Sequence, residues 1–94
     1  MTLTVFGIRF PLGQLVITRG AYDKLSELDV NVAINRHVIG DGGELDERDR
    51  EENDLAVDHG GRLMSRYNSR EGTVFWIITE YDRSVTTILL PLEY

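Results

Sequence analysis

Three polar side chains have the types that acid–base chemistry on a phosphodiester requires. Glu80 would serve as the base, Arg83 would hold the phosphate and His37 would act as the acid. If they converged in one cleft, they would form the site of a small ribonuclease-like toxin. The structural alternative makes His37 a core histidine that is hydrogen-bonded to backbone, and Glu80 with Arg83 a local ion pair in an ordinary turn. We prefer this alternative, because no spacing of a nucleophile and a base is readable from the chain.

Other kinds of catalytic or cofactor site have little support. Cysteine is absent, which excludes thiolate metal sites, disulfides and cysteine nucleophiles. His37 and His59 are twenty-two residues apart and belong to no HExxH motif, so no metal site is expected. The glycine-rich stretch 40–43 follows an expected helix and lacks the GK[ST] sequence of a phosphate-binding loop. The sequence therefore predicts a protein without a cofactor, and a non-enzymatic one.

Acidic residues are concentrated in one segment, residues 41–58. The 94-residue chain has a net charge of −6, yet outside this segment it is close to neutral. Within the segment only Arg48 and Arg50 oppose nine carboxylates. Charge runs of this kind are usually solvated helix faces. The functional alternative is a decoy that occupies the phosphate-binding groove of a basic partner.

The decoy interpretation assigns the partner contacts to the acidic segment and to the turn near residue 80. An acidic total charge also argues against direct binding of nucleic acid by this chain. The candidate partner-binding residues are Asp41, Glu44, Asp46, Glu47, Asp49, Glu51, Glu52, Asp54, Glu80 and Asp82.

Hydrophobic periodicity predicts three helices that would position these residues. Tyr22, Leu25 and Leu28 recur at three-residue steps, which favours a short helix over 19–28 that Thr18 caps. Asp29 is the expected cap of a second helix, which Gly40 ends. A third helix is expected over 45–59 with Asp46 as its cap, anchored only near its C-terminal end, and with ion pairs Asp46–Arg50 and Arg48–Glu52 along its side.

Alternating and β-branched residues predict the strands. Expected strands cover residues 2–6, 14–18, 62–68, 73–81 and 85–90. The run 73–81 is apolar on both faces and should lie at the centre of the sheet, with Phe75 and Trp76 most simply interpreted as core and alternatively as a partner surface. The sequence thus predicts a single α+β domain over residues 1–94, with two or three short helices packed on a C-terminal three-stranded meander joined by an N-terminal strand.

The chain also resembles a known family along nearly its whole length. The resemblance is carried by the stretches FPLGQLVIT at 10–18, RHVIGD at 36–41, WIITE at 76–80, DRS at 82–84 and TTILLP at 86–91. These are similar to small "plasmid-related" proteins of plasmids, integrative elements and phages, some of which are labelled as associated with type I restriction–modification. The chain departs from that pattern at Gly42, where the family has tryptophan, and at Arg19, where it has proline.

The resemblance implies an accessory role on a mobile element and carries over no catalytic residues. Together with the acidic segment, it leads us to expect a protein that binds and inhibits a host defence complex, of the anti-CRISPR or anti-restriction type. No membrane-spanning run and no signal peptide are evident, so the expected location is the cytoplasm of the bacterial host. A homodimer formed through an unpaired edge of the meander is a further alternative.

Overall fold

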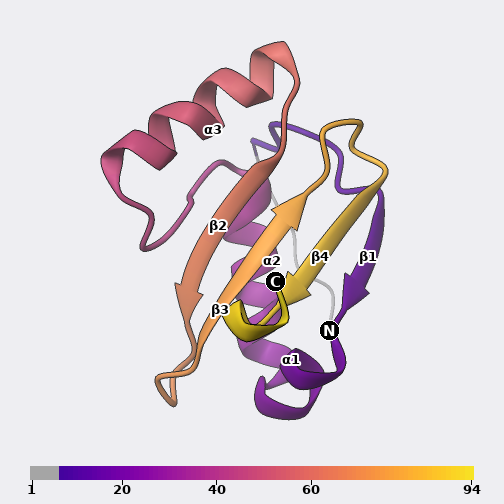
Figure 1. Ribbon diagram of the computed structural model, residues 1–94, viewed down its shortest axis with the longest axis vertical. Helices are drawn as coiled ribbons and strands as arrows, with labels where there is room; N and C mark the ends of the chain where they lie inside the picture. The colour runs from indigo at the N-terminus through magenta and orange to yellow at the C-terminus, as the bar shows by residue number, and fades with distance from the viewer. Residues whose placement is uncertain (1–6) are drawn as a thin grey trace.

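The computed structural model describes residues 7–94, so the strand expected at 2–6 lies outside the described residues. One strand comes first along the chain, then three helices, then three strands and a final short 3₁₀ helix (Figure 1). The elements are β1 (Gln14–Ile17), α1 (Arg19–Lys24), α2 (Glu27–Val38), α3 (Glu47–His59), β2 (Leu63–Asn68), β3 (Val74–Thr79), β4 (Val85–Leu89) and the short 3₁₀ helix η1 (Pro91–Glu93).

The strands form one mixed sheet in the order β1-β4-β3-β2. β2, β3 and β4 pair antiparallel as the predicted meander, and β1 adds to β4 in parallel. β3 is central, as expected from its apolar character on both faces. The prediction of an α+β domain with short helices on a small sheet is therefore confirmed.

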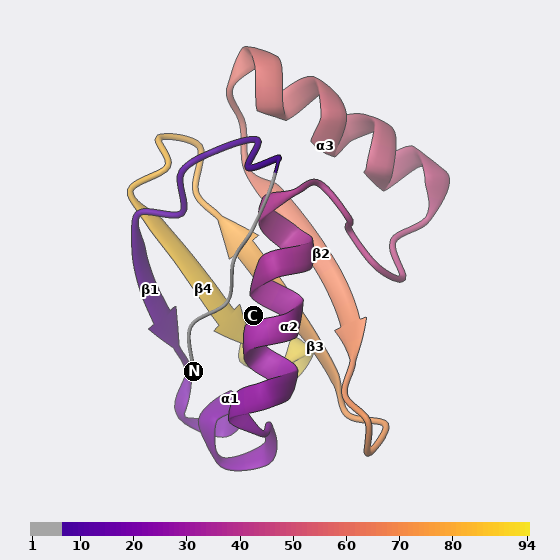
Figure 2. The same cartoon turned by 180° about the vertical axis from the view of Figure 1, so that it is seen from behind.

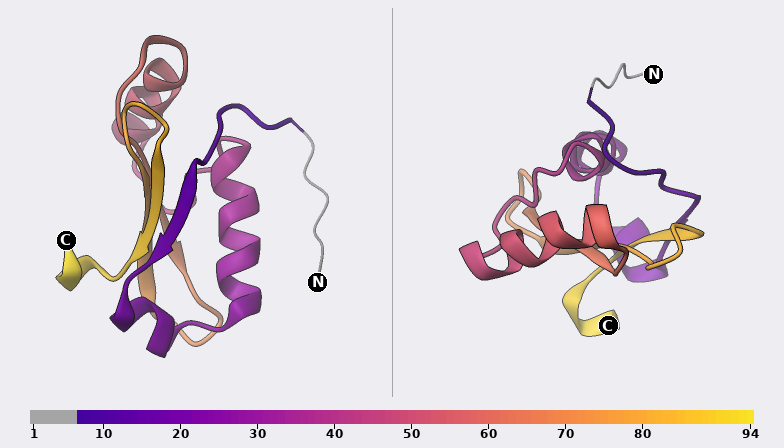
Figure 3. Two further views of the ribbon diagram at one scale, coloured as in Figure 1. Left: turned by 90° about the vertical axis from the view of Figure 1, so that its right-hand side faces the viewer. Right: turned by 90° about the horizontal axis from the view of Figure 1, so that it is seen from above.

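Helix α2 packs along one face of the sheet, whereas within residues 7–94 the opposite face carries only the short C-terminal turn η1 (Figures 2 and 3). Side chains alternate along β2 as predicted, with Leu63, Ser65 and Tyr67 buried on the helix side. Burial of apolar surface between these two layers supplies most of the stabilisation. The central cluster of buried residues is Ala21, Leu25, Ala33, Tyr67, Phe75, Ile77 and Ile88.

The predicted boundary between the first two helices is wrong. Leu25 adopts an extended conformation that ends α1 after Lys24, and Ser26 caps α2 by accepting a hydrogen bond from the Asp29 N–H at 3.1 Å. Asp29 lies within the first turn of α2, where its carboxylate accepts from the Arg70 guanidinium at 2.9 Å. The sequence pattern predicts Asp29 as the cap because Leu25 and Leu28 continue the apolar spacing of the first helix up to that residue, and aspartate caps as well as serine does.

Both edges of the meander are covered, so the unpaired meander edge expected from sequence is absent among residues 7–94. β1 occupies the edge of β4. On the outer edge of β2, the Arg66 N–H donates to Gly42 O at 3.0 Å and the Glu44 N–H donates to Arg66 O at 2.7 Å. This pairing also fixes the start of the acidic segment against the sheet.

Candidate functional site

The acidic segment forms α3 and the loop before it, beyond one end of β2 (Figure 1). Asp46 caps the helix by accepting from the Asp49 N–H at 2.9 Å, as predicted, and Gly60 ends it with a φ of 83°. None of the residues of α3 is buried. Ala56 and Val57 are half-buried and form its apolar contact, whereas Leu55 is 62% exposed. The helix therefore contributes little to the core.

Polar contacts rather than apolar packing hold α3 in place. The side-chain amide of Asn53 pairs with both backbone groups of Met64 on the outer edge of β2, donating to its carbonyl and accepting from its N–H at 3.0 Å. Arg9 forms an ion pair with Asp54 at 3.1 Å. One contact is made to the sheet and the other to the loop before β1, so together they set the orientation of the helix while most of its surface faces solvent.

The carboxylates of the segment fall into two groups. Some have local structural partners: Asp41 binds the Arg36 guanidinium at 2.8 Å, and that hydrogen bond holds the pKa of Asp41 below its usual value. Asp46 is the helix cap, Asp54 pairs with Arg9 and Glu52 lies 3.6 Å from Arg48. The others are exposed and form no ion pair or side-chain hydrogen bond within residues 7–94: Glu44, Glu47, Asp49, Glu51 and Asp58.

Only one of the two expected ion pairs along α3 forms. Arg48 pairs with Glu52, as predicted. Arg50 does not bind Asp46, because its guanidinium turns back to the preceding loop and donates to the carbonyls of Gly43 and Leu45, the latter at 3.2 Å. Arg50 therefore closes the loop, which leaves Arg48 as the basic residue among the free carboxylates.

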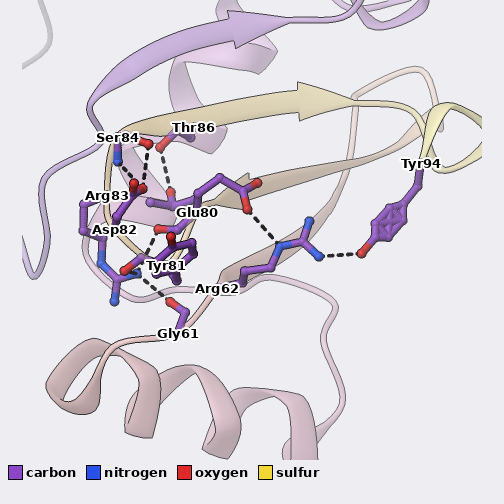
Figure 4. A network of polar contacts seen from close by, with 10 residues as sticks. Gly61, Arg62, Glu80, Tyr81, Asp82, Arg83, Ser84, Thr86 and Tyr94 are labelled. Atoms are coloured by element: carbon purple, nitrogen blue, oxygen red, sulfur yellow. Dashed lines mark hydrogen bonds and ion pairs between the residues drawn. The ribbon is translucent and has the colours of Figure 1, made fainter.

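The turn between β3 and β4 is built around Arg83 (Figure 4). Its backbone has a φ of 61°, in the left-handed region that is uncommon for residues other than glycine. Its guanidinium donates to Gly61 O at 2.5 Å, Glu80 O at 3.1 Å and Ala56 O at 2.7 Å. Arg83 thus joins the C-terminal end of α3 to the turn, and its side chain faces backbone carbonyls.

The expected ion pair between Glu80 and Arg83 is absent from the described structure. Glu80 instead binds Arg62 at 3.2 Å, and Arg62 donates to the Tyr94 hydroxyl at 2.6 Å (Figure 4). Asp82 accepts from the Ser84 N–H at 3.0 Å and from its hydroxyl at 2.6 Å, which lowers the pKa of Asp82. Both acids that sequence assigned to the partner surface in this turn thus have partners of their own.

His37 is buried beneath the sheet and belongs to a chain of hydroxyl groups. Its Nδ1 lies 2.6 Å from Ser65 Oγ and its Nε2 lies 2.9 Å from Thr79 Oγ1. Thr79 Oγ1 is in turn 2.7 Å from Thr86 Oγ1, which donates to Leu12 O at 2.7 Å. Sequence correctly placed this histidine in the core, but it is bonded to side chains rather than to backbone.

The carbonyl at the end of this chain sets the direction of three of its four hydrogen bonds. A carbonyl only accepts, so Thr86 donates to Leu12, Thr79 donates to Thr86, and the His37 Nε2–H donates to Thr79. The direction of the fourth bond follows from the charge of the ring, because Nδ1 of a neutral imidazole accepts from Ser65. Burial lowers the pKa of His37 to about 4, so the ring is neutral near pH 7.

The three side chains of the ribonuclease alternative therefore have separate structural partners. His37 uses both ring nitrogens within the core, Arg83 binds carbonyls and Glu80 binds Arg62. The hollow that His37 lines has a volume of about 10 Å³, and neither Glu80 nor Arg83 lines it. No observation favours catalysis by these residues, and the ribonuclease hypothesis stays a prediction from sequence.

Comparisons with family models, with curated proteins and with solved structures find no match for this chain. Within residues 7–94, no group of three or more histidine, aspartate or glutamate side chains is placed to hold a metal ion. None of the described helices has the length and apolar character needed to cross a membrane. The candidate site is therefore defined by the geometry of α3 and its loop.

Proposed function

We propose that this protein is a mobile-element accessory protein that binds and inhibits a host defence complex, of the anti-CRISPR or anti-restriction type. The solvent-facing side of α3 and its preceding loop would supply the contact surface. The observation that carries the proposal is that α3 buries no residue, is fixed in place by polar contacts, and carries exposed carboxylates that have no partner within residues 7–94.

A fixed acidic helix suits recognition of a basic groove. The contacts of Asn53 and Arg83 hold α3 in one orientation, so little conformational entropy is lost when a partner binds it. Clustered negative charge steers association with a positively charged surface and competes with phosphate groups there. Such a protein would inhibit a nucleic-acid-binding complex by occupying the groove through which the nucleic acid passes.

The geometry reduces the set of residues assigned to the contact. Asp41, Asp46 and Asp54 are engaged in the loop, the cap and the Arg9 ion pair. Glu80 and Asp82 belong to the network of the β3–β4 turn (Figure 4). The proposed contact residues are thus the five exposed acids without a partner, Glu44, Glu47, Asp49, Glu51 and Asp58, together with Glu52, whose pair with Arg48 is itself exposed on α3.

Pull-down of purified restriction and CRISPR effector complexes tests the proposal. A triple variant with Glu47→Lys, Glu51→Lys and Glu52→Lys should lose capture of the complex that the wild type binds. The matched control is Asp23→Lys, Glu27→Lys and Glu71→Lys, which changes the net charge equally at exposed positions outside the segment, with Glu27 and Glu47 each at the first position of a helix. Equal capture of wild type, triple variant and control would show that the acidic helix α3 is not the contact surface.

A further inference from the structure

The outer edge of β1 is the open edge of the sheet among residues 7–94 (Figures 1 and 2). The Gln14 N–H donates to Ser84 O at 2.9 Å and the Thr18 N–H donates to Ile88 O at 3.0 Å, so even-numbered residues pair with β4. Successive residues of an edge strand direct their backbone groups to opposite sides. The N–H and C=O groups of Leu15 and Ile17 therefore point away from the sheet.

This edge is apolar and carries none of the usual protection against strand pairing. Leu15, Val16 and Ile17 are 49%, 40% and 36% exposed, and β1 contains no charged residue, proline or bulge. A hollow of about 390 Å³ lies beside the strand on the helix side. Its lining residues are Ile17, Tyr22, Leu25, Glu27 and Val30.

We propose that β1 pairs antiparallel with β1 of a second copy of this chain, about a two-fold axis at Val16. In this register Leu15 exchanges backbone hydrogen bonds with Ile17 of the second copy, so the outward groups of both residues are satisfied. Val16 then faces Val16 of the second copy in a non-hydrogen-bonded pair, where side chains approach most closely. The two sheets become one continuous sheet, and Leu15 of the second copy extends the apolar surface beside the hollow.

Charge at the ends of the strand favours a second copy as the occupant. Arg19 is exposed directly after the C-terminal end of β1. At the other end, Gly13 is in close contact with the backbone of Arg83 and Ser84, and the neighbouring Asp82 is exposed. An antiparallel two-fold pair brings Arg19 of each copy to the end where Asp82 of the other lies. The uncharged strand between them adds no repulsion.

The β1 surface is separate from α3, so this inference goes beyond the proposed inhibition and is tested independently of it. Sedimentation equilibrium of the full chain from about 1 µM to about 1 mM should show a reversible dimer. Val16→Lys places two like charges opposite each other at the axis and should weaken dimerisation at least about tenfold. The matched control is Val32→Lys on α2, where the valine is 46% exposed, and it should dimerise as the wild type does.

Two further measurements identify the surface itself. Arg19→Glu should weaken the dimer, whereas Lys24→Glu, an equal change of charge on the same helix, should leave it unchanged. In the wild type, the amide hydrogens of Leu15 and Ile17 should exchange more slowly as the concentration rises, and in the folded Val16→Lys variant they should not. A wild type that stays monomeric throughout, or a Val16→Lys variant that dimerises equally well, overturns the proposal.

Discussion

At the scale of single residues, the hydroxyl–imidazole chain is the feature with the clearest chemical consequence. The chain consists of five groups, which come from three strands, α2 and the loop at Leu12. Each group donates a hydrogen bond to the next, from Ser65 through His37 to the carbonyl of Leu12. Protonation of the imidazole would reverse the bond to Ser65, because the ring would then donate from both nitrogens and the Ser65 hydroxyl would lose the acceptor of its own proton. The core is therefore sensitive to pH at one residue.

We expect the protein to lose stability as the pH falls from about 6.5 to about 4. In the unfolded chain His37 takes up a proton near its ordinary pKa of 6.5, whereas in the folded protein its pKa is about 4. The unfolded state thus binds more protons within this window, and the free energy of unfolding decreases by up to about 3 kcal/mol. Chemical denaturation between pH 7.5 and pH 5, where most carboxylates remain ionised, measures the slope.

The variant His37→Gln provides the control for this pH dependence. Glutamine can donate to one hydroxyl and accept from another but does not titrate. The slope between pH 6.5 and pH 5 should be smaller in the variant than in the wild type. Equal slopes in the two proteins would contradict a neutral, buried His37.

Arg83→Lys should destabilise the protein by about 1–3 kcal/mol, because an ammonium group cannot span the carbonyls of Ala56, Gly61 and Glu80. Urea denaturation measures the loss. Arg48→Lys is the matched control, since the Arg48 side chain is 87% exposed and should tolerate the change. If the Arg83→Lys variant were as stable as Arg48→Lys, the hydrogen bonds from Arg83 to the three carbonyls would contribute nothing to the stability of the protein.

At the scale of elements, α3 is unusual because polar side chains attach it to the rest of the protein, with only Ala56 and Val57 as its apolar contact. The side-chain amide of Asn53 forms two hydrogen bonds with the backbone of Met64, as a neighbouring strand would. It lies next to residues 42–44, whose backbone pairs with Arg66. The Asn53 side chain and residues 42–44 therefore cover the outer edge of β2, whereas the outer edge of β1 is open among residues 7–94. This difference explains why the two edges of the sheet differ in what they can bind.

Asn53→Ala should release α3 from β2 and cost about 1–2 kcal/mol, because both backbone groups of Met64 lose their partner. The Met64 amide hydrogen should exchange faster in this variant, while amides within β3 are little changed. The control is Asn68→Ala, at an exposed position of β2, the strand that contains Met64. Unchanged protection of Met64 in Asn53→Ala would contradict the role of this amide.

Much of this architecture was predictable from local patterns. The alternation in β2, the apolar run of β3, the Asp46 cap and Gly60 stop of α3 each identify an element with no tertiary information. The first two helices were divided at the wrong residue because Leu25, which ends α1, also continues the apolar spacing of the helix. Its extended backbone depends on packing in the core.

The site was predictable only in part. Its acidic character and its exposure follow from composition, since α3 has few apolar residues. The sequence does not show which group each side chain of the site binds, because the partners are not neighbours in the sequence. Asp54 binds Arg9, Asn53 binds the backbone of Met64 and Glu80 binds Arg62. Nothing in the sequence distinguishes Arg83, with its positive φ, from an ordinary arginine in a turn.

At the scale of the whole molecule, the net charge of −6 is spatially segregated. The two-layer body of sheet, α1 and α2 is near neutral, and α3, which carries most of the acids of the segment, lies at one end of it (Figure 3). The open edge of β1 lies away from α3 across the sheet, since β1 and β2 are its outermost strands. A dimer through β1 would therefore display two acidic helices at once and raise the avidity of the proposed inhibitor for a partner with two basic grooves.

The most direct measurement of the central claim is the salt dependence of binding to the defence complex that the wild type captures. If α3 occupies a basic groove, the dissociation constant should rise steeply as salt increases from about 50 mM to about 200 mM, and nucleic acid should compete for the same groove. The Glu47, Glu51 and Glu52 triple lysine variant should bind weakly, with little remaining salt dependence. Binding that is insensitive to salt, and equal in wild type and triple variant, would contradict the account.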